Sequence, residues 1–241
     1  MTMQSTDRAG PAYWPASLIL ALGFVVAALV LGLAVRDARM ADRFVEVKGL
    51  AEREVMADLA IWPVSYMVTA NMLEELSREL ERNDRAILAF LESHGFPAAG
   101  ISRNPPRITD QWSQAYGPQR PETRFMAERT LTLRTDRVAE TRQALQEAAR
   151  LLEDGVVLAP SWGSTVQFLF TGLEALKPEM IGQATADARR AATQFAEDSG
   201  SEVGTIRTAR QGFFSISELD PSMPELKTVR VVTTVEYFLD R

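Results

Sequence analysis

The chain of 241 residues contains no cysteine and only one histidine, His94. Without cysteine it can form no disulfide bond, thiolate zinc site, iron–sulfur cluster or cysteine nucleophile. A histidine-based metal site or a Ser-His-Asp triad would depend on His94 alone. This residue lies where a helix is predicted to end, and a polar or positive side chain there interacts favourably with the last helical carbonyl groups. The sequence therefore indicates no catalytic residues, no metal and no cofactor, and we expect no enzymatic activity.

An excess of positive charge is also lacking, since 26 lysines and arginines stand against 32 aspartates and glutamates, for a net charge of −6. The arginines are scattered and form no basic stretch, so the electrostatic pattern of a nucleic-acid-binding protein is absent. The glycines also lack the GxGxxG and GxxxxGK[ST] spacings of phosphate-binding loops. We therefore expect no nucleic-acid partner.

The longest apolar segment runs from Ala16 to Val35 and contains no charged residue. At about 1.5 Å per helical residue, this run is about long enough to cross a hydrocarbon layer of ~30 Å. We predict that it is a transmembrane anchor, preceded by a tail over residues 1–15. Within the anchor, Ala28 and Gly32 form a small-xxx-small pair. This pair would let two helices approach closely, or it reflects how common small residues are in membrane helices.

A cleaved leader is the alternative interpretation of the same run. Leaders have an apolar core of roughly 7–15 residues and a small-residue cleavage site, whereas this run is longer and is followed by a charged linker over residues 36–42. The side of the membrane is also open to two interpretations. Only one arginine precedes the run, whereas Arg36, Arg39 and Arg43 follow it, and this distribution by itself favours a cytoplasmic C-terminal domain.

Residues 43–241 are predicted to form one α+β domain. Period-two alternation, helical spacing of apolar residues and glycine or proline breaks divide it into strand pairs separated by helices. The expected strands span 43–49, 54–70, the two arms of a hairpin over 101–134, 165–170, 205–217 and 227–239, and the expected helices run from Asn71 to Gly95, Asp136 to Gly155 and Pro178 to Gly200. This order predicts antiparallel sheets with about three packed helices.

Local residue types set the expected boundaries of these elements. We expect Asn71 to cap the first helix and Asp136 to cap the second, while Pro178 takes the favoured first position of the third. On the third helix, helical spacing predicts a buried face made of a row of alanines and Phe195. In the long second strand, Pro63 lacks a backbone donor and therefore predicts a sheet edge or a bulge.

Asp58 is unusual because it lies in an apolar strand, where an unpartnered buried carboxylate would be costly. It faces outward by strand alternation, or it accepts backbone donors at a bulge. We favour these structural roles over a functional one.

Trp112 and Tyr116 lie in the proline-rich middle of the hairpin and form the one candidate interaction surface. Large aromatic side chains on a loop are costly to leave in water, and aromatic residues are enriched at interface hot spots. The alternative is that the two rings cover the domain's own sheet.

Four motifs follow one another in the domain: Val45-Glu46-Val47-Lys48-Gly49, Ala57-Asp58-Leu59-Ala60, Phe125-Met126-Ala127, and a helix with alanines at 184, 188, 192 and 196 followed by Gly200 and Gly204. In this order, with helices between them, they resemble the SIMPL-domain family, which includes the periplasmic immunogenic proteins of Gram-negative bacteria. The resemblance covers residues 43–241. Family members usually have a proline before the aspartate, where this chain has Ala57.

The resemblance implies an extracytoplasmic α+β domain, of a kind that in some members assembles into large rings, and it implies no catalytic residues. We therefore expect a single-pass inner-membrane protein with its C-terminal domain in the periplasm. There it would act as a non-catalytic binding or self-assembly module, with a role in envelope stress protection. Its expected partners are the membrane, further copies of itself and an envelope protein. The alternative is a soluble periplasmic ligand-binding or chaperone-like protein with a cleaved leader.

Overall fold

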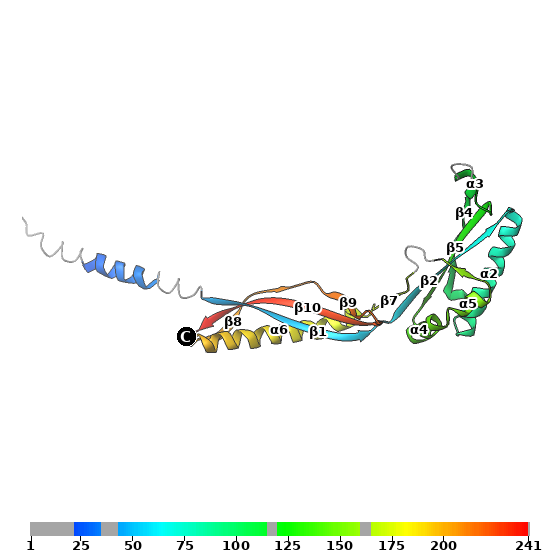
Figure 1. Cartoon of the computed structure of the whole chain (residues 1–241). Coiled ribbons are helices and arrows are strands. Elements are labelled where there is room, and N and C mark those ends of the chain that lie inside the picture. The colour runs from blue at the N-terminus through cyan, green and yellow to red at the C-terminus, as the bar shows by residue number, and fades with distance from the viewer. Residues whose placement is uncertain (1–21, 35–42, 115–119, 160–164, 241) are drawn as a thin grey trace, which may run out of the picture. The chain divides into compact units, whose positions relative to one another are not determined.

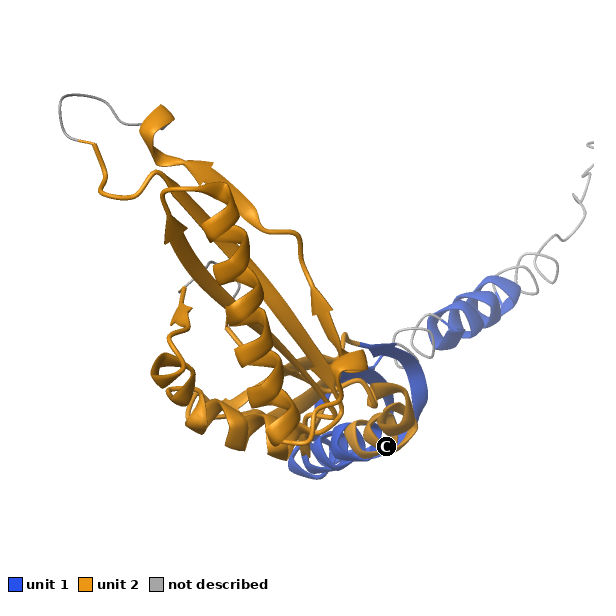
Figure 2. Cartoon of the chain, turned by 90° about the vertical axis from the view of Figure 1, so that its right-hand side faces the viewer, with its two compact units in different colours: residues 1–49, 185–211, 233–241 blue, residues 50–184, 212–232 orange. Residues whose placement is uncertain are grey.

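The computed structural model describes residues 22–34, 43–114, 120–159 and 165–240. The chain divides into two compact units, shown in blue and orange in Figure 2. Unit 1 comprises residues 1–49, 185–211 and 233–241, and unit 2 comprises residues 50–184 and 212–232.

The N-terminal part of the chain is described only over residues 22–34, which are helical (Figure 1). Ala28 and Gly32 lie in this helix, whereas Ala16 and Val35, the ends of the predicted anchor, lie outside the described residues. Within the part of the chain that the structure describes, no helix is both long enough and apolar enough to cross a membrane.

The remaining elements form two antiparallel sheets and several helices, which confirms the predicted α+β class. Sheet A has four strands in the order β1-β10-β8, with β9 also paired to β10, and sheet B has six in the order β3-β5-β2-β6, with β4 on β5 and β7 on β2. The elements are β1 (Phe44–Met56), β2 (Leu59–Ala70), α2 (Leu73–Ser93), η1 (Ala98–Gly100), β3 (Ile101–Arg103), β4 (Arg107–Asp110), α3 (Gln111–Gln114), β5 (Phe125–Thr135), α4 (Val138–Glu147), α5 (Arg150–Glu153), β6 (Val157–Leu158), β7 (Gln167–Leu169), α6 (Leu173–Asp198), β8 (Glu202–Gln211), β9 (Ser215–Asp220) and β10 (Met223–Asp240).

Sheet B buries one face against helices of unit 2, and α2 lies along this face in Figure 2. Strand alternation places every second residue of β2 in the core, as the sequence predicts. These residues pack against the apolar stripe of α2 and against α4 and α5; the core includes Trp62, Val64, Tyr66, Val68, Leu76, Leu80, Ile87, Leu91, Ala144 and Leu151. Pro63 pairs with Thr132 of β5 and lies between the part of β2 that pairs with β7 and the part that pairs with β6.

Helix α6 packs its row of alanines on sheet A, and the predicted alanine face is confirmed. In unit 1, Ala188 and Ala192 pack against Val235 and Tyr237. In unit 2, Ala184 packs with Met180 against the apolar face of β10. The prediction for Phe195 is wrong, because its side chain is 59% exposed and the helix buries Ala196 instead.

Three predicted helix starts are also wrong. Helix α6 begins at Leu173, so Pro178 lies inside the helix and not at its first position. The residue before α2 is Met72, and Asn71 instead accepts the backbone N–H of Arg124 on its Oδ1 at 3.1 Å. Asp136 does not cap α4 either, because Arg137 is the capping residue and makes no side-chain bond to the helix. A tertiary contact takes up the Asn71 side chain, and additional helical residues precede Pro178. Nothing in the structure explains why Asp136 does not cap α4.

Candidate functional site

Asp58 joins three strands and a helix in unit 2. It lies at the break between β1 and β2, and its carboxylate accepts the backbone N–H groups of Thr171 at 2.8 Å and Gly172 at 2.9 Å. These two residues precede the first residue of α6, where negative charge interacts favourably with the helix dipole. Its own N–H donates to Leu169 O at 2.9 Å, and the neighbouring N–H of Ala57 donates to Glu225 O at 2.8 Å. The interpretation of Asp58 as an acceptor of backbone donors is confirmed.

His94 ends α2, as the sequence indicates. Its Nδ1 lies 2.8 Å from Phe90 O, and its Nε2 lies 3.4 Å from Oε2 of Glu147. A carbonyl oxygen only accepts hydrogen bonds, so Nδ1 carries the hydrogen in this arrangement. Among the described residues, no group of three or more His, Cys, Asp or Glu side chains is placed to hold a metal ion.

Trp112 lies in α3 and is held by residues 120–124, which precede β5. Its Nε1 donates to Pro121 O at 3.1 Å, and the guanidinium groups of Arg120 and Arg124 lie 5.7 Å and 5.6 Å from its ring centroid. Arg124 also donates twice to Asp110, which lowers the pKa of that carboxyl group. The Trp112 side chain remains 39% exposed. Tyr116, predicted to share this surface, lies outside the described residues.

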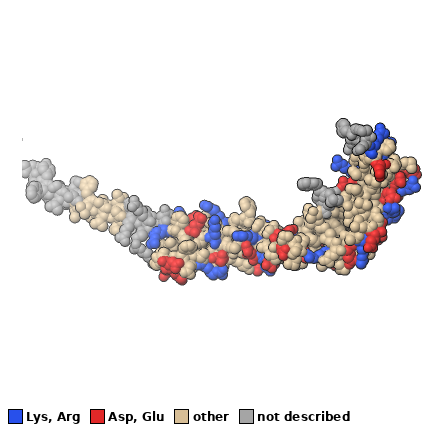
Figure 3. Space-filling view, viewed as in Figure 1, with Lys and Arg blue, Asp and Glu red and all other residues tan. Residues whose placement is uncertain are grey.

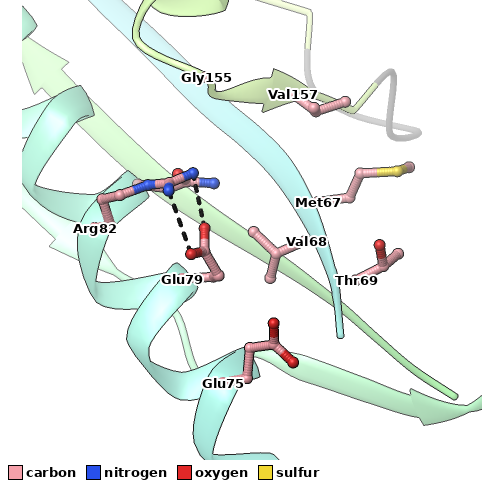
Figure 4. Close-up of a pocket in the computed structure, with 9 residues that line it drawn as sticks. Met67, Val68, Thr69, Glu75, Glu79, Arg82, Gly155 and Val157 are labelled. Atoms are coloured by element: carbon pink, nitrogen blue, oxygen red, sulfur yellow. Dashed lines mark hydrogen bonds and ion pairs between the residues drawn. The ribbon is translucent and has the colours of Figure 1, made fainter. Parts of the chain in front are cut away.

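A cavity of about 390 Å³ opens between the end of β2 and helix α2, as shown in Figure 4. Arg82 and Glu79 form an ion pair of 2.7 Å across one side of it. Met67, Val68 and Val157 supply an apolar wall. Thr69, Glu75 and Asn83 also line the cavity, so its lining carries polar groups besides this ion pair.

The polar network of unit 2 is buried in its core. The hydroxyl of Tyr66 lies 2.6 Å from Asp84 Oδ1 and 3.0 Å from Leu80 O, and Arg129 Nη1 donates to Asp84 Oδ2 at 2.6 Å. The Tyr66 residue is 0% exposed. Burial, followed by its hydrogen bond to Asp84, raises the pKa of Tyr66 well above its ordinary value. The phenol therefore keeps its proton and remains a donor to the carboxylate.

Sequence reasoning missed this network, although a signal was present. Asp84 is four residues after Leu80 and three before Ile87, so it lies on the apolar stripe of α2. Arg129 occupies the alternating position between Ala127 and Leu131, both fully buried. A carboxylate and a guanidinium at core positions of adjacent elements predict a buried ion pair, because neither charge can be buried alone at low cost.

A second cavity, of about 630 Å³, lies beside this network. Helix α2 forms one wall, and the segment from Arg103 to Ile108 forms the other. Pro105 and Pro106 lack N–H donors and interrupt the edge of the sheet between β3 and β4. Asp84 and Arg129 both line the cavity, so the network lies at its wall. We refer to it below as the α2–β3 cavity.

The fold and these contacts define an α+β domain built around two antiparallel sheets. In it, Asp58 binds the backbone N–H groups just ahead of helix α6. The chain matches the family model SIMPL, described as a protein of unknown function (DUF541), over residues 45–237. The protein therefore belongs to the SIMPL family, and the resemblance seen in the sequence is confirmed. A comparison with curated proteins finds no match.

Proposed function

We propose that this SIMPL domain is a membrane-anchored, extracytoplasmic module that acts without catalysis, by binding and by assembling with copies of itself. Membership of the family supports the domain assignment, and the uncharged run from Ala16 to Val35 supports the anchor. A role in envelope stress protection belongs to the same proposal. On the face seen in Figure 3, Lys and Arg atoms are interspersed with Asp and Glu atoms, which gives no reason to add a nucleic-acid partner.

The open face of sheet B is the observation that carries the self-assembly proposal. The helices of unit 2 pack on the other face, with the core residues of β2. Strand alternation gives the open face a central set of partly exposed, mostly uncharged side chains: Ile61, Pro63, Met67, Met126, Thr130 and Thr132. A sheet face that the described helices leave uncovered is typical of an interface.

A second copy of the chain is the occupant that this face suits best. Its charges are few: Glu128 pairs with Arg107 of the neighbouring strand, and Arg134 lies further along β5, so the charge that two copies bring together is small. Ser65 and Thr130 already bond each other through their hydroxyl groups at 2.7 Å. Burying this pair in an interface therefore leaves neither hydroxyl without a partner.

We expect the segment 43–241 to form oligomers at tens of micromolar, measured by size-exclusion chromatography with light scattering. Thr132 lies opposite Pro63 at the centre of the open face, and Thr132→Lys should shift the mass to that of a monomer by burying an unpaired charge in the interface. Ala89→Lys adds the same charge on the exposed side of α2 and should leave the mass unchanged. A native segment that is strictly monomeric would refute the self-assembly proposal.

The proposed location predicts the outcome of proteolysis on whole cells. A protease added to intact spheroplasts should digest residues 43–241 while a cytosolic marker survives. The arginines that follow the anchor favour the opposite orientation, but this bias is statistical and long translocated domains often override it. Full protection of the domain until the cells are lysed would place it in the cytoplasm and contradict the proposal.

A further inference from the structure

The α2–β3 cavity has an apolar end and a polar end. Strand β5 shows how the cavity is oriented. Ile108 of β4 pairs with Ala127, near the start of β5, whereas Arg103 of β3 pairs with Leu131, further along it. Helix α2 runs in the same direction as β5. Asn71, before the helix, bonds Arg124 before β5, and Asp84, further along the helix, bonds Arg129 further along β5. Along this direction Leu73, Leu76 and Ile108 lie toward one end, and the four charged lining residues lie toward the other: Glu81, Asp84, Arg103 and Arg129. The remaining lining residues are Ser77, Leu80, Asn104, Pro105 and Pro106.

The polar end contains a buried ion pair. Tyr66 and Arg129 hold the Asp84 carboxylate from both oxygens, and the side chains of Asp84 and Arg129 are only 9% and 19% exposed. Within the described structure, the buried Nε of Arg129 has no hydrogen-bond partner. A buried ion pair with an unsatisfied donor contributes little to stability compared with apolar packing. A role in shaping a binding site would account for the Asp84–Arg129 pair at the wall of this cavity.

Two charged groups at the polar end remain available to a ligand. Arg103 and Glu81 both line the cavity and are exposed. Neither side chain forms an ion pair or a hydrogen bond with another described residue, although the backbone of Arg103 pairs with Leu131 in the sheet. One belongs to β3 and the other to α2, so they face the cavity from its two walls. The polar end thus presents one unpaired cation and one unpaired anion next to a neutralised pair.

We propose that the α2–β3 cavity binds an apolar α-amino acid. Its carboxylate would accept hydrogen bonds from Arg103, its ammonium group would pair with Glu81, and its hydrocarbon side chain would lie against Leu73, Leu76 and Ile108. A zwitterion has no net charge and so matches the balanced charges of the polar end. The volume of about 630 Å³ lies within the range of small-molecule sites. This site is separate from the open face of sheet B and does not depend on self-assembly.

Equilibrium dialysis of the full chain in detergent micelles against labelled L-leucine tests the proposal, with protein-free micelles as the blank. We expect saturable binding of one leucine per chain. Two analogues separate the charged groups: 4-methylpentanoate lacks the ammonium group, and 3-methylbutylamine lacks the carboxylate. Each should compete at least about tenfold more weakly than leucine, because each leaves one charged residue of the site unpaired.

Matched variants locate the binding. Arg103→Gln and Glu81→Gln should each weaken leucine binding by about tenfold or more. Arg107→Gln on the neighbouring strand and Glu74→Gln in the first turn of α2 change residues outside the cavity lining and should leave binding unchanged. All four positions are exposed, and unchanged thermal unfolding would confirm that each variant folds.

Three results would overturn the proposal: no saturable leucine binding up to millimolar concentrations, equal binding by all four variants, or 4-methylpentanoate binding as tightly as leucine. The oligomeric state of the same samples, measured by light scattering, tests the self-assembly proposal separately.

Discussion

Replacing Arg129 with methionine is expected to lower the free energy of unfolding by about 3–5 kcal/mol, because it leaves the buried Asp84 carboxylate without its cation. Arg129 Nη1 lies 2.6 Å from that carboxylate, and the Asp84 side chain is only 9% exposed. Tyr66 would remain as a donor but cannot neutralise the charge. Urea unfolding followed by tryptophan fluorescence measures the loss, since Trp62 is buried in the same core.

The double variant Asp84→Leu, Arg129→Met separates the cost of an unpaired charge from the value of the pair. It removes both charges together, so its stability should lie within about 1–2 kcal/mol of the native protein, on either side. The Tyr66 hydroxyl keeps an acceptor in Leu80 O. Arg107→Met changes an exposed arginine and should alter stability by less than about 0.5 kcal/mol. If Arg129→Met cost no more than Arg107→Met, the Asp84–Arg129 pair would not be buried as described.

Asp58→Ala is expected to lower the free energy of unfolding by about 2–4 kcal/mol, because two backbone N–H groups lose a charged acceptor. Those groups, on Thr171 and Gly172, precede α6, whose apolar face packs on sheet A. Asp58→Asn keeps one acceptor oxygen and should lose roughly half as much. Chemical denaturation of the three proteins under the same conditions gives the comparison.

Asp136→Ala is the matched control for this prediction. The sequence identifies Asp136 as a helix cap, whereas the structure gives α4 no side-chain cap. Substitution at this exposed position should therefore change stability by less than about 0.5 kcal/mol. A larger loss at residue 136 than at residue 58 would show that the local capping rule was right and the tertiary role of Asp58 wrong.

Periodic features of this fold could be predicted from the sequence because they depend on burial alone. The alternation in β2 and the alanine row of α6 both follow from one buried face. Even so, the predicted break between the first two strands came too early, since β1 continues to Met56 and the chain turns at Ala57 and Asp58. Nothing local distinguishes that position, because the bonds that fix it come from Leu169 and from residues 171, 172 and 225.

Helix boundaries and the candidate site depended on contacts that span long stretches of the sequence. Asn71 has the right side chain for a cap, but Arg124 takes its oxygen. Pro178 costs α6 one backbone hydrogen bond, and the helix nevertheless starts five residues earlier, at Leu173. The Asp84–Arg129 pair joins positions 45 residues apart, so only a search for charged residues at apolar positions of both elements could have suggested it.

The pairing of β1 with β10 also constrains how the domain can be synthesised. Every strand of sheet B lies between residues 59 and 169, so this sheet can form while the chain is still being made. Sheet A cannot, because its first strand pairs with the last strand of the chain. Until β10 emerges, β1 remains an unpaired strand edge that can join the wrong partner. A chain that stops after residue 169 but before residue 223 would therefore have a complete sheet B and an aggregation-prone strand β1 without its partner.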